Sequence, residues 1–193
     1  MRACAFKNPR SQRLRYVHAE SVLVATADRA TREGLPRSPF RGPIDGVFAG
    51  GTLAYAASPG VLEYVAQMKV RFKQEAAPLV AADKATWATL PGSPILYGAP
   101  GTHPLVAELL AAHGEKVGAD GITVAGKTFE GKDLVLIVAY PRPDDAMRGV
   151  LVYTAASDAT LVGVNALYHG PGDWVVGHKL PDGTWGAVGR GDF

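Results

Sequence analysis

The sequence predicts an α/β fold, with an open, mainly parallel central sheet, helices on both faces and an inserted β-hairpin. Two observations support this class. Apolar, strand-like runs alternate with helical patterns over most of the 193 residues. The strongest runs, Asp133–Pro141 and Gly149–Ser157, are almost continuously apolar, which is typical of strands that are covered on both faces. A chain of this length can form one domain with a sizeable core.

The first half of the predicted domain contains two strands and two helices. Gly51–Ser58 is an apolar run that ends at a Pro-Gly pair, so we expect a strand there. Apolar residues at spacings of four, three and four predict an amphipathic helix over Val61–Lys84, which Pro78 divides or ends. Pro94–Ala99 is a second short strand, and the helical pattern that follows it ends at Gly114.

The second half adds the hairpin and the strongest strands. Two short strands around a Gly-Lys pair predict a hairpin over Gly121–Gly131. After the two continuous apolar runs we expect a helix over Asp158–Gly170, with Ser157 or Asp158 as its cap. Two strands flanking Pro181–Gly183 complete the chain.

Residues 1–42 are expected to be a basic N-terminal arm with one strand, Ser21–Asp28, and a proline-rich linker, followed by a single domain over residues 43–193. Up to Asp45 the chain has nine Lys and Arg against four Asp and Glu, within a total of +2. Because these arginines are scattered through the arm, a solvated, partly ordered segment is favoured over a nucleic-acid-binding one. The N-terminal stretch lacks the apolar region of a signal peptide, and no run approaches the ~18 residues of a membrane span.

The sequence indicates no metal site and no cofactor. The single cysteine, Cys4, excludes an internal disulfide framework and a multi-cysteine zinc site. The five histidines do not have the spacing of metal ligands. The chain also lacks a Walker A loop and the G-x-G-x-x-G pattern of dinucleotide-binding folds.

Three candidate catalytic residues follow predicted strands. Ser58, His103 and Asp144 would lie on one edge of a parallel sheet, where open α/β sheets bind ligands. There they could serve as nucleophile, base and orienting carboxylate. Each also has a structural explanation: Ser58 as a helix cap, His103 as an exposed first-turn residue, and Asp144 as the start of a turn or short helix. The G-x-S-x-G pattern of a nucleophile elbow is absent.

The turn between Gly98 and His103 is the candidate ligand-binding segment. Its proposed ligand-binding residues are Gly98, Gly101 and Thr102, because backbone N–H groups at a helix start favour an anion. The alternative is a plain corner between a strand and a helix, with Thr102 as the N-cap and Pro104 in the first turn.

Several short motifs carry a resemblance to a known family. In order they are GPIDGVF, PILYGAPGTHPLVAELLA, ITVAGKTFEGKDLVLIVAYPRP and GVLVYTAAS, within about Gly42 to Trp174. They resemble the Rossmann-like domain at the C-terminal end of many bacterial esterase-like and prolyl-oligopeptidase-like proteins. In that family the domain adjoins an α/β-hydrolase domain, which this sequence lacks, and His103 stands where Asn is expected. The resembling proteins are often exported.

Two functions follow as hypotheses. The first is an accessory or ligand-binding domain associated with a bacterial hydrolase, whose partner is a small molecule or an α/β-hydrolase domain. The alternative is a small cofactor-free hydrolase of the esterase or lactonase type. The missing nucleophile elbow favours the first, and the candidate residues at strand ends favour the second.

Overall fold

The computed structural model describes residues 5–7, 14–16, 40, 42–49 and 52–193, and the chain divides into two compact units, Met1–Arg37 and Ser38–Phe193. In the first unit the described backbone forms two short antiparallel strands, β1 (Ala5–Lys7) and β2 (Leu14–Tyr16). The predicted strand Ser21–Asp28 and the residue Cys4 lie outside the described residues. The second unit carries every feature discussed below.

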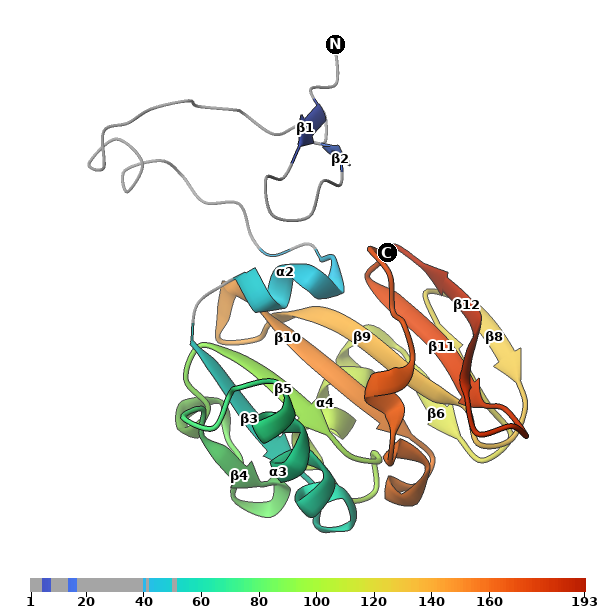
Figure 1. The fold of residues 1–193 in the computed structure, drawn as a ribbon, viewed down its shortest axis with the longest axis horizontal. Coiled ribbons are helices and arrows are strands. Elements are labelled where there is room, and N and C mark those ends of the chain that lie inside the picture. The colour runs from blue at the N-terminus through green and yellow to red at the C-terminus, as the bar shows by residue number, and fades with distance from the viewer. Residues whose placement is uncertain (1–4, 8–13, 17–39, 41, 50–51) are drawn as a thin grey trace. The chain divides into compact units, whose positions relative to one another are not determined.

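A seven-stranded mixed sheet forms the centre of the second unit, in the order β12-β11-β9-β10-β5-β3-β4 (Figure 1). The strands are β3 (Leu53–Ala57), β4 (Leu79–Ala81), β5 (Ser93–Tyr97), β9 (Val135–Arg142), β10 (Asp145–Ala155), β11 (Trp174–Lys179) and β12 (Trp185–Gly191). Strands β4, β3, β5 and β10 are parallel, whereas β9 is antiparallel to both β10 and β11, and β12 is antiparallel to β11.

The predicted fold class is wrong. The described part of the chain is rich in β-structure rather than Rossmann-like: its main sheet is mixed, and one of its faces is covered largely by a second, antiparallel sheet. The error arises at β9 and β10, which a two-residue turn joins into a long antiparallel hairpin. A continuous apolar run reports that a strand is buried on both faces, but it carries no information about the strand's direction.

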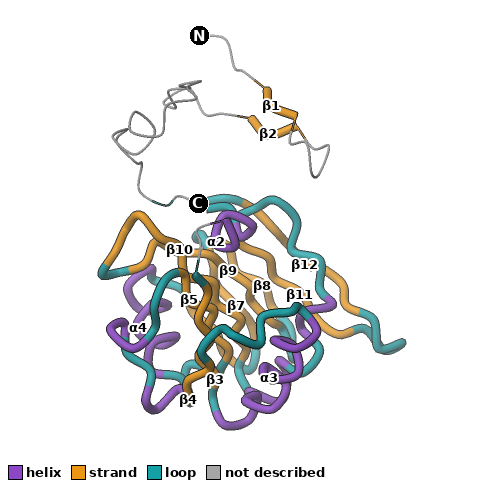
Figure 2. The backbone as a smooth tube through the Cα atoms, turned by 60° about the vertical axis from the view of Figure 1, so that its left-hand side comes forward, coloured by secondary structure: helices purple, strands orange, loops and turns teal. Residues whose placement is uncertain are grey.

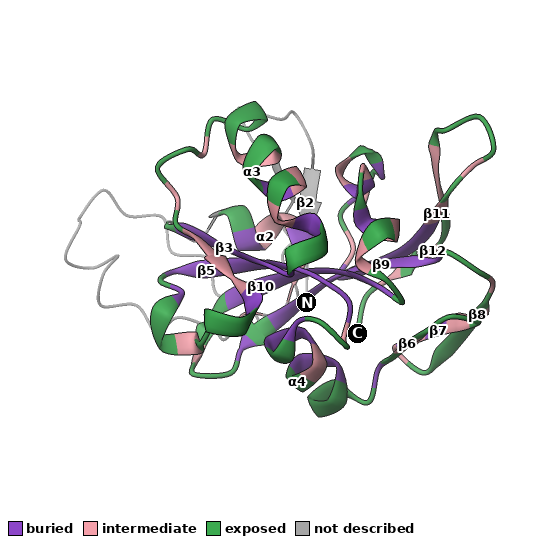
Figure 3. Ribbon diagram, turned by 90° about the horizontal axis from the view of Figure 1, so that it is seen from below, coloured by how far each residue is buried: buried purple, intermediate pink, exposed green. Residues whose placement is uncertain are grey.

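The two faces of the sheet have different covers. One face packs against α2 (Ile44–Ala49), α3 (Leu62–Arg71) and two 3₁₀ turns, Asp158–Leu161 and Val164–Ala166. The other packs against α4 (Pro104–His113) and a three-stranded antiparallel sheet. Figure 3 shows the buried central strands between these covers, and Figure 2 shows α3 and α4 on opposite sides of the sheet.

The small sheet contains the predicted hairpin. Its strands are β6 (Lys116–Gly118), β7 (Gly121–Val124) and β8 (Lys127–Glu130). Strands β7 and β8 pair around Ala125 and Gly126, both of which have positive φ, as a tight two-residue hairpin turn requires. The hairpin prediction is therefore confirmed, and β6 is an additional strand on its edge.

The helices are shorter than predicted. Helix α3 ends at Arg71, well before Lys84, and Lys73 just beyond it has a positive φ. The helix expected over Asp158–Gly170 is absent, and the two 3₁₀ turns stand in its place, with Gly163 at positive φ between them. Helix α4 ends at Gly114, as predicted, and this glycine has the left-handed conformation of a helix C-cap.

Six apolar residues from four of the predicted strands are buried in the sheet: Leu53, Leu96, Val135, Ile137, Val150 and Val152. Across the described ranges, no helix is both long enough and apolar enough to span a membrane.

Candidate functional site

The ends of three parallel strands bring together a small polar cluster. Ser58 follows β3, Gly98 follows β5 and Asp158 follows β10. His103 immediately precedes α4, which begins at Pro104. Because the strands are parallel, their carboxyl ends share one edge of the sheet, and the four residues meet there.

Gly98 allows Ser58 and His103 to approach each other. A Cβ atom at Gly98 would lie 2.7 Å from Ser58 Oγ and 2.8 Å from His103 Cβ. Both side chains are fully buried. The Ser58 hydroxyl donates to the backbone carbonyl of Tyr97 at 3.4 Å, and no side-chain bond caps the turn that follows Ser58. The capping role considered for Ser58 is therefore wrong.

The carboxylate of Asp158 fills the Gly98–His103 turn. Its Oδ1 accepts hydrogen bonds from Ala99 N–H and from Thr102 Oγ, both at 2.8 Å. Burial acts to raise the pKa of Asp158, but hydrogen bonds from Ala99, Ser58, Thr102 and the Gly60 N–H outweigh it, so the pKa is lowered. The protein's own side chain thus occupies the position that an external anion would take.

His103 is neutral in this environment. Burial lowers its pKa to about 4, against the opposing effects of the nearby Ala56 carbonyl and the Asp158 carboxylate. Neither ring nitrogen makes a hydrogen bond of acceptable geometry with the described residues, although the Ala56 carbonyl lies close enough to favour the protonated ring. The expectation of an exposed first-turn histidine is therefore wrong.

Asp144 does not join the cluster. It lies in the turn between β9 and β10, next to the start of β10, whereas the cluster lies where β10 ends. Its carboxylate binds Arg142 through both oxygens, and this guanidinium is the main reason that the pKa of Asp144 is lowered. The nearly buried Arg142 also donates to the carbonyls of Leu90, Gly92 and Trp87. Asp144 thus supports a structural anchor at the opposite edge of the sheet.

The three predicted ligand-binding residues of the turn have different roles. The Gly98 N–H donates to the carbonyl of Tyr153, and Thr102 Oγ donates to Asp158. Gly101 is exposed, and an added Cβ would meet no atom within 4 Å. The N-cap position of α4 belongs to His103 rather than to Thr102, and Pro104 is the first helical residue, as predicted.

The cluster lacks the hydrogen bond that activates a nucleophilic serine. Such a serine donates to an imidazole nitrogen, which a carboxylate orients from its other side. Here the Ser58 hydroxyl is directed to a carbonyl and to Asp158, while the His103 nitrogens are unpartnered among the described residues. With both side chains fully buried, the arrangement is that of a packed structural corner.

A tyrosine-lined pocket lies against the face of the sheet that α2 and α3 cover. It is a hollow of about 400 Å³, within the ~300–1,000 Å³ of small-molecule sites. Six aromatic side chains line it: Phe48, Tyr55, Phe72, Tyr97, Tyr153 and Tyr168. Leu53, Ile95 and Leu167 add aliphatic surface.

Strand register explains why the tyrosines gather. Tyr97 and Tyr153 are direct partners on the parallel strands β5 and β10, so their side chains leave the same face. Their rings stack with centroids 4.4 Å apart and an interplanar angle of 1°. Tyr55 on β3 pairs with Ile95 and belongs to the same apolar cluster. Each of these three strands therefore contributes one tyrosine to the pocket.

Asn165 supplies a fixed polar group to the pocket wall. Its Oδ1 accepts from Tyr64 Oη at 2.7 Å and from Tyr97 Oη at 3.3 Å, and its Nδ2 lies 2.9 Å from Tyr97 Oη. The backbone N–H of Asn165 donates to Tyr64 Oη at 3.2 Å. Burial raises the pKa of Tyr97 and of Tyr153, so both phenols are neutral. The pocket combines an apolar wall with a few convergent polar groups, as ligand sites do.

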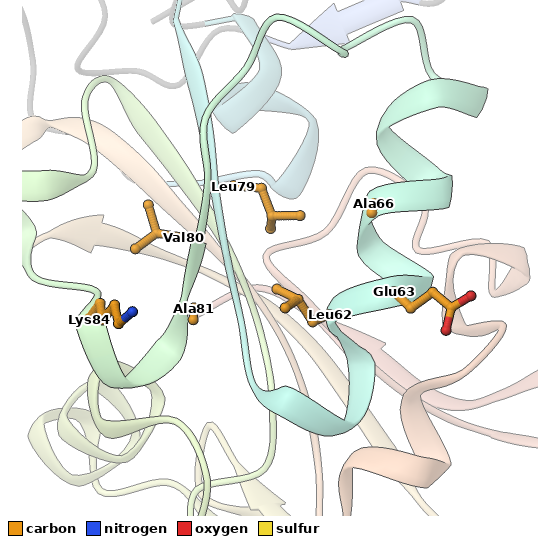
Figure 4. Close-up of a pocket in the computed structure, with 7 residues that line it drawn as sticks. All are labelled: Leu62, Glu63, Ala66, Leu79, Val80, Ala81 and Lys84. Atoms are coloured by element: carbon orange, nitrogen blue, oxygen red, sulfur yellow. The ribbon is translucent and has the colours of Figure 1, made fainter.

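A second hollow, of about 630 Å³, lies along the edge strand β4 (Figure 4). In the close-up Leu79, Leu62 and Ala66 lie on the α3 side of the strand, whereas Val80 and Lys84 lie on the other. The walls of this second hollow diverge around a strand edge, and no aromatic side chain lines it. The tyrosine pocket is therefore the better candidate for a small-molecule site.

Sequence reasoning missed both Asp158 as a cluster member and the tyrosine pocket. Asp158 had been assigned to the cap of a helix that does not form. For the pocket a signal was present, because the runs LAYAA, SPILY and VLVYTA each carry one tyrosine among apolar residues. One tyrosine on each of three strands indicates a shared aromatic surface, once the strands are known to be adjacent.

Within the described ranges, no group of three or more His, Cys, Asp or Glu side chains could hold a metal ion. No family model, curated protein or solved structure matches this chain.

Proposed function

We propose that this chain is a ligand-binding module, which takes up a small organic molecule in the tyrosine pocket without reacting with it. One observation carries the proposal: a partly open hollow of suitable volume is walled by six aromatic side chains and holds the polar Asn165–Tyr97 pair. Aromatic walls favour a ligand with a flat ring, and the polar pair offers it a fixed hydrogen-bonding direction.

The association with a bacterial hydrolase remains part of this proposal and rests on the sequence resemblance. In that arrangement the module would hold a substrate or product of an adjoining hydrolase domain. The hydrolase alternative for this chain itself assigns the reaction to Ser58 and His103. We favour binding over hydrolysis because the Ser58 hydroxyl is not directed to His103.

A blocking substitution tests the binding function. Ala166 is an exposed residue of a 3₁₀ turn that lines the pocket, so Ala166→Phe fills the hollow without removing core side chains. Ala159 is an exposed residue of the neighbouring 3₁₀ turn and does not line it, so Ala159→Phe is the matched control. The probe is 2-naphthamide, a neutral flat molecule, and its binding is measured by calorimetric titration.

The expected dissociation constant for the unchanged protein and for Ala159→Phe is about 1 mM or tighter, as ligand efficiencies for a molecule of this size imply. Ala166→Phe should weaken binding at least about tenfold, since it occupies the ligand's space. Equal binding by both variants would place the probe elsewhere. A chromogenic ester and a lactone should show no turnover above background, and turnover lost in Ser58→Ala would favour the hydrolase alternative.

A further inference from the structure

The charged side chains around the tyrosine pocket indicate which charge its ligand carries. Two of the tyrosines that line the pocket have a cationic side chain close to their ring. Lys69 Nζ lies 6.0 Å from the centre of the Tyr55 ring, and the Arg190 guanidinium lies 6.0 Å from the centre of the Tyr168 ring. Both tyrosines line the pocket.

Neither cation is neutralised by a carboxylate within salt-bridge distance in the described part of the chain. One acidic side chain lies beside the lining: Asp45, whose Oδ1 lies 3.8 Å from Nδ1 of the lining residue His169. Among the charged side chains that these contacts place beside the lining, two are cations, Lys69 and Arg190, and one is the carboxylate of Asp45. An anionic group at the pocket is favoured by this balance, and a cationic one is disfavoured.

Burial separates the apolar and polar ends of the site. Tyr97 and Tyr153 are almost fully buried at the sheet, whereas Tyr168 is 57% exposed and Phe72 is 50% exposed. A ligand's ring would therefore contact the stacked tyrosines, while its charged group stays near solvent and the basic side chains, so the charge avoids the cost of full desolvation.

Resting on the proposed function, we propose that the physiological ligand class is an aromatic carboxylate: a flat aromatic ring carrying one carboxyl group. The ring packs against Tyr97 and Tyr153 on the inner side of the pocket. The carboxylate faces the field of Lys69 and Arg190.

Three probes with one ring system and different charges test this ligand class: 2-naphthoate, 2-naphthamide and 2-naphthylmethylamine, which are anionic, neutral and cationic at neutral pH. Each is titrated calorimetrically into the full chain at low ionic strength. Naphthoate should bind most tightly and the amine least tightly. Lys69→Met and Arg190→Met should each weaken naphthoate binding about two- to fivefold, as expected for loss of a solvent-exposed charge interaction, and this loss should be larger than the loss for naphthamide.

The matched control is Lys84→Met, which removes a lysine from the β4 groove rather than from the tyrosine pocket. It should bind all three probes as the unchanged protein does. Equal affinities for the three probes, or tightest binding of the amine, would overturn the carboxylate assignment while leaving the binding function intact. If none of the probes binds, the proposed function fails, and the ligand class fails with it.

Discussion

Gly98 is the residue around which the strand-end cluster packs. Gly98→Ala should reduce the free energy of unfolding by about 1–3 kcal/mol, because the new methyl group would overlap Ser58 Oγ and His103 Cβ in a region with no free space. Gly101→Ala, in the same turn, adds its methyl group where nothing lies within 4 Å and should cost less than about 0.5 kcal/mol. Urea denaturation of the two variants measures both values, and equal losses would show that the cluster is loosely packed.

The buried His103 makes stability depend on pH. An unfolded histidine has its pKa near 6.5, whereas in the folded protein the pKa of His103 is lowered to about 4. Between these values the unfolded chain binds a proton that the folded chain does not, so stability is full above pH ~6.5 and falls as the pH decreases toward ~4. The loss should be at most about 3 kcal/mol, from 1.36 kcal/mol per pKa unit.

His103→Leu isolates this effect. Leucine fills a similar volume and cannot be protonated, and the imidazole nitrogens that it replaces have no hydrogen-bond partner in the described ranges. The unfolding free energy of the variant should therefore fall less between neutral and acidic pH than that of the unchanged protein. Parallel losses in the two proteins would mean that another group causes the acid sensitivity.

Among individual residues, sequence reasoning identified Ser58 and His103 as neighbours but chose the wrong carboxylate. Ser58 directly follows the apolar strand β3, and His103 ends the turn after the apolar strand β5, so their edge of the sheet could be predicted. The choice between Asp144 and Asp158 depended on the direction of β9, which side-chain pattern does not encode. The burial of His103 could not be predicted either, because the turn packs against Ser58 and Asp158, which lie far away in the sequence.

At the level of elements, Arg142 fixes the β9–β10 hairpin to the loop that precedes β5. Its guanidinium serves three backbone carbonyls and Asp144 at once. Arg142→Met keeps the apolar stem but leaves these nearly buried acceptors unpaired, so the free energy of unfolding should fall by about 2–4 kcal/mol.

Asp144→Asn is the comparison for Arg142→Met. The side chain of Asp144 is 44% exposed, so its substitution should cost less than about 1 kcal/mol. Thermal and urea unfolding of the two variants would measure the difference. Comparable losses would make the carboxylate, rather than the carbonyl contacts, the main source of stability at this anchor.

The elements that could be predicted are those whose ends are marked by residues with specific backbone preferences. The β7–β8 hairpin has Gly126 at its turn, and α4 has Pro104 at its start and Gly114 at its end. The helix expected over Asp158–Gly170 had no such consistent signal, since Gly163 interrupts it at positive φ. The two 3₁₀ turns that replace it place Asn165 and Leu167 in the pocket wall.

For the whole molecule, the pattern of apolar runs correctly indicated one large sheet with a buried centre, and it also indicated that β3, β5 and β10 lie in that sheet. It could not indicate that β9, β11 and β12 extend the sheet with antiparallel pairs. At the carboxyl ends of the parallel strands, the carboxylate of Asp158 fills the turn where a ligand was expected. The partly open aromatic surface lies instead on the face of the sheet, where Tyr55, Tyr97 and Tyr153 gather.

We propose that the tyrosine pocket, rather than the Ser58–His103 cluster, is the functional site of the molecule. The most direct measurement is a crystal structure of the full chain soaked with 2-naphthamide, the neutral probe of the binding experiment. We expect the ring to lie against Tyr97 and Tyr153 within reach of Asn165, and Asp158 to keep accepting hydrogen bonds from Ala99 and Thr102. A probe bound instead at the Gly98–His103 turn, with Asp158 displaced from it, would show that the turn is the functional site.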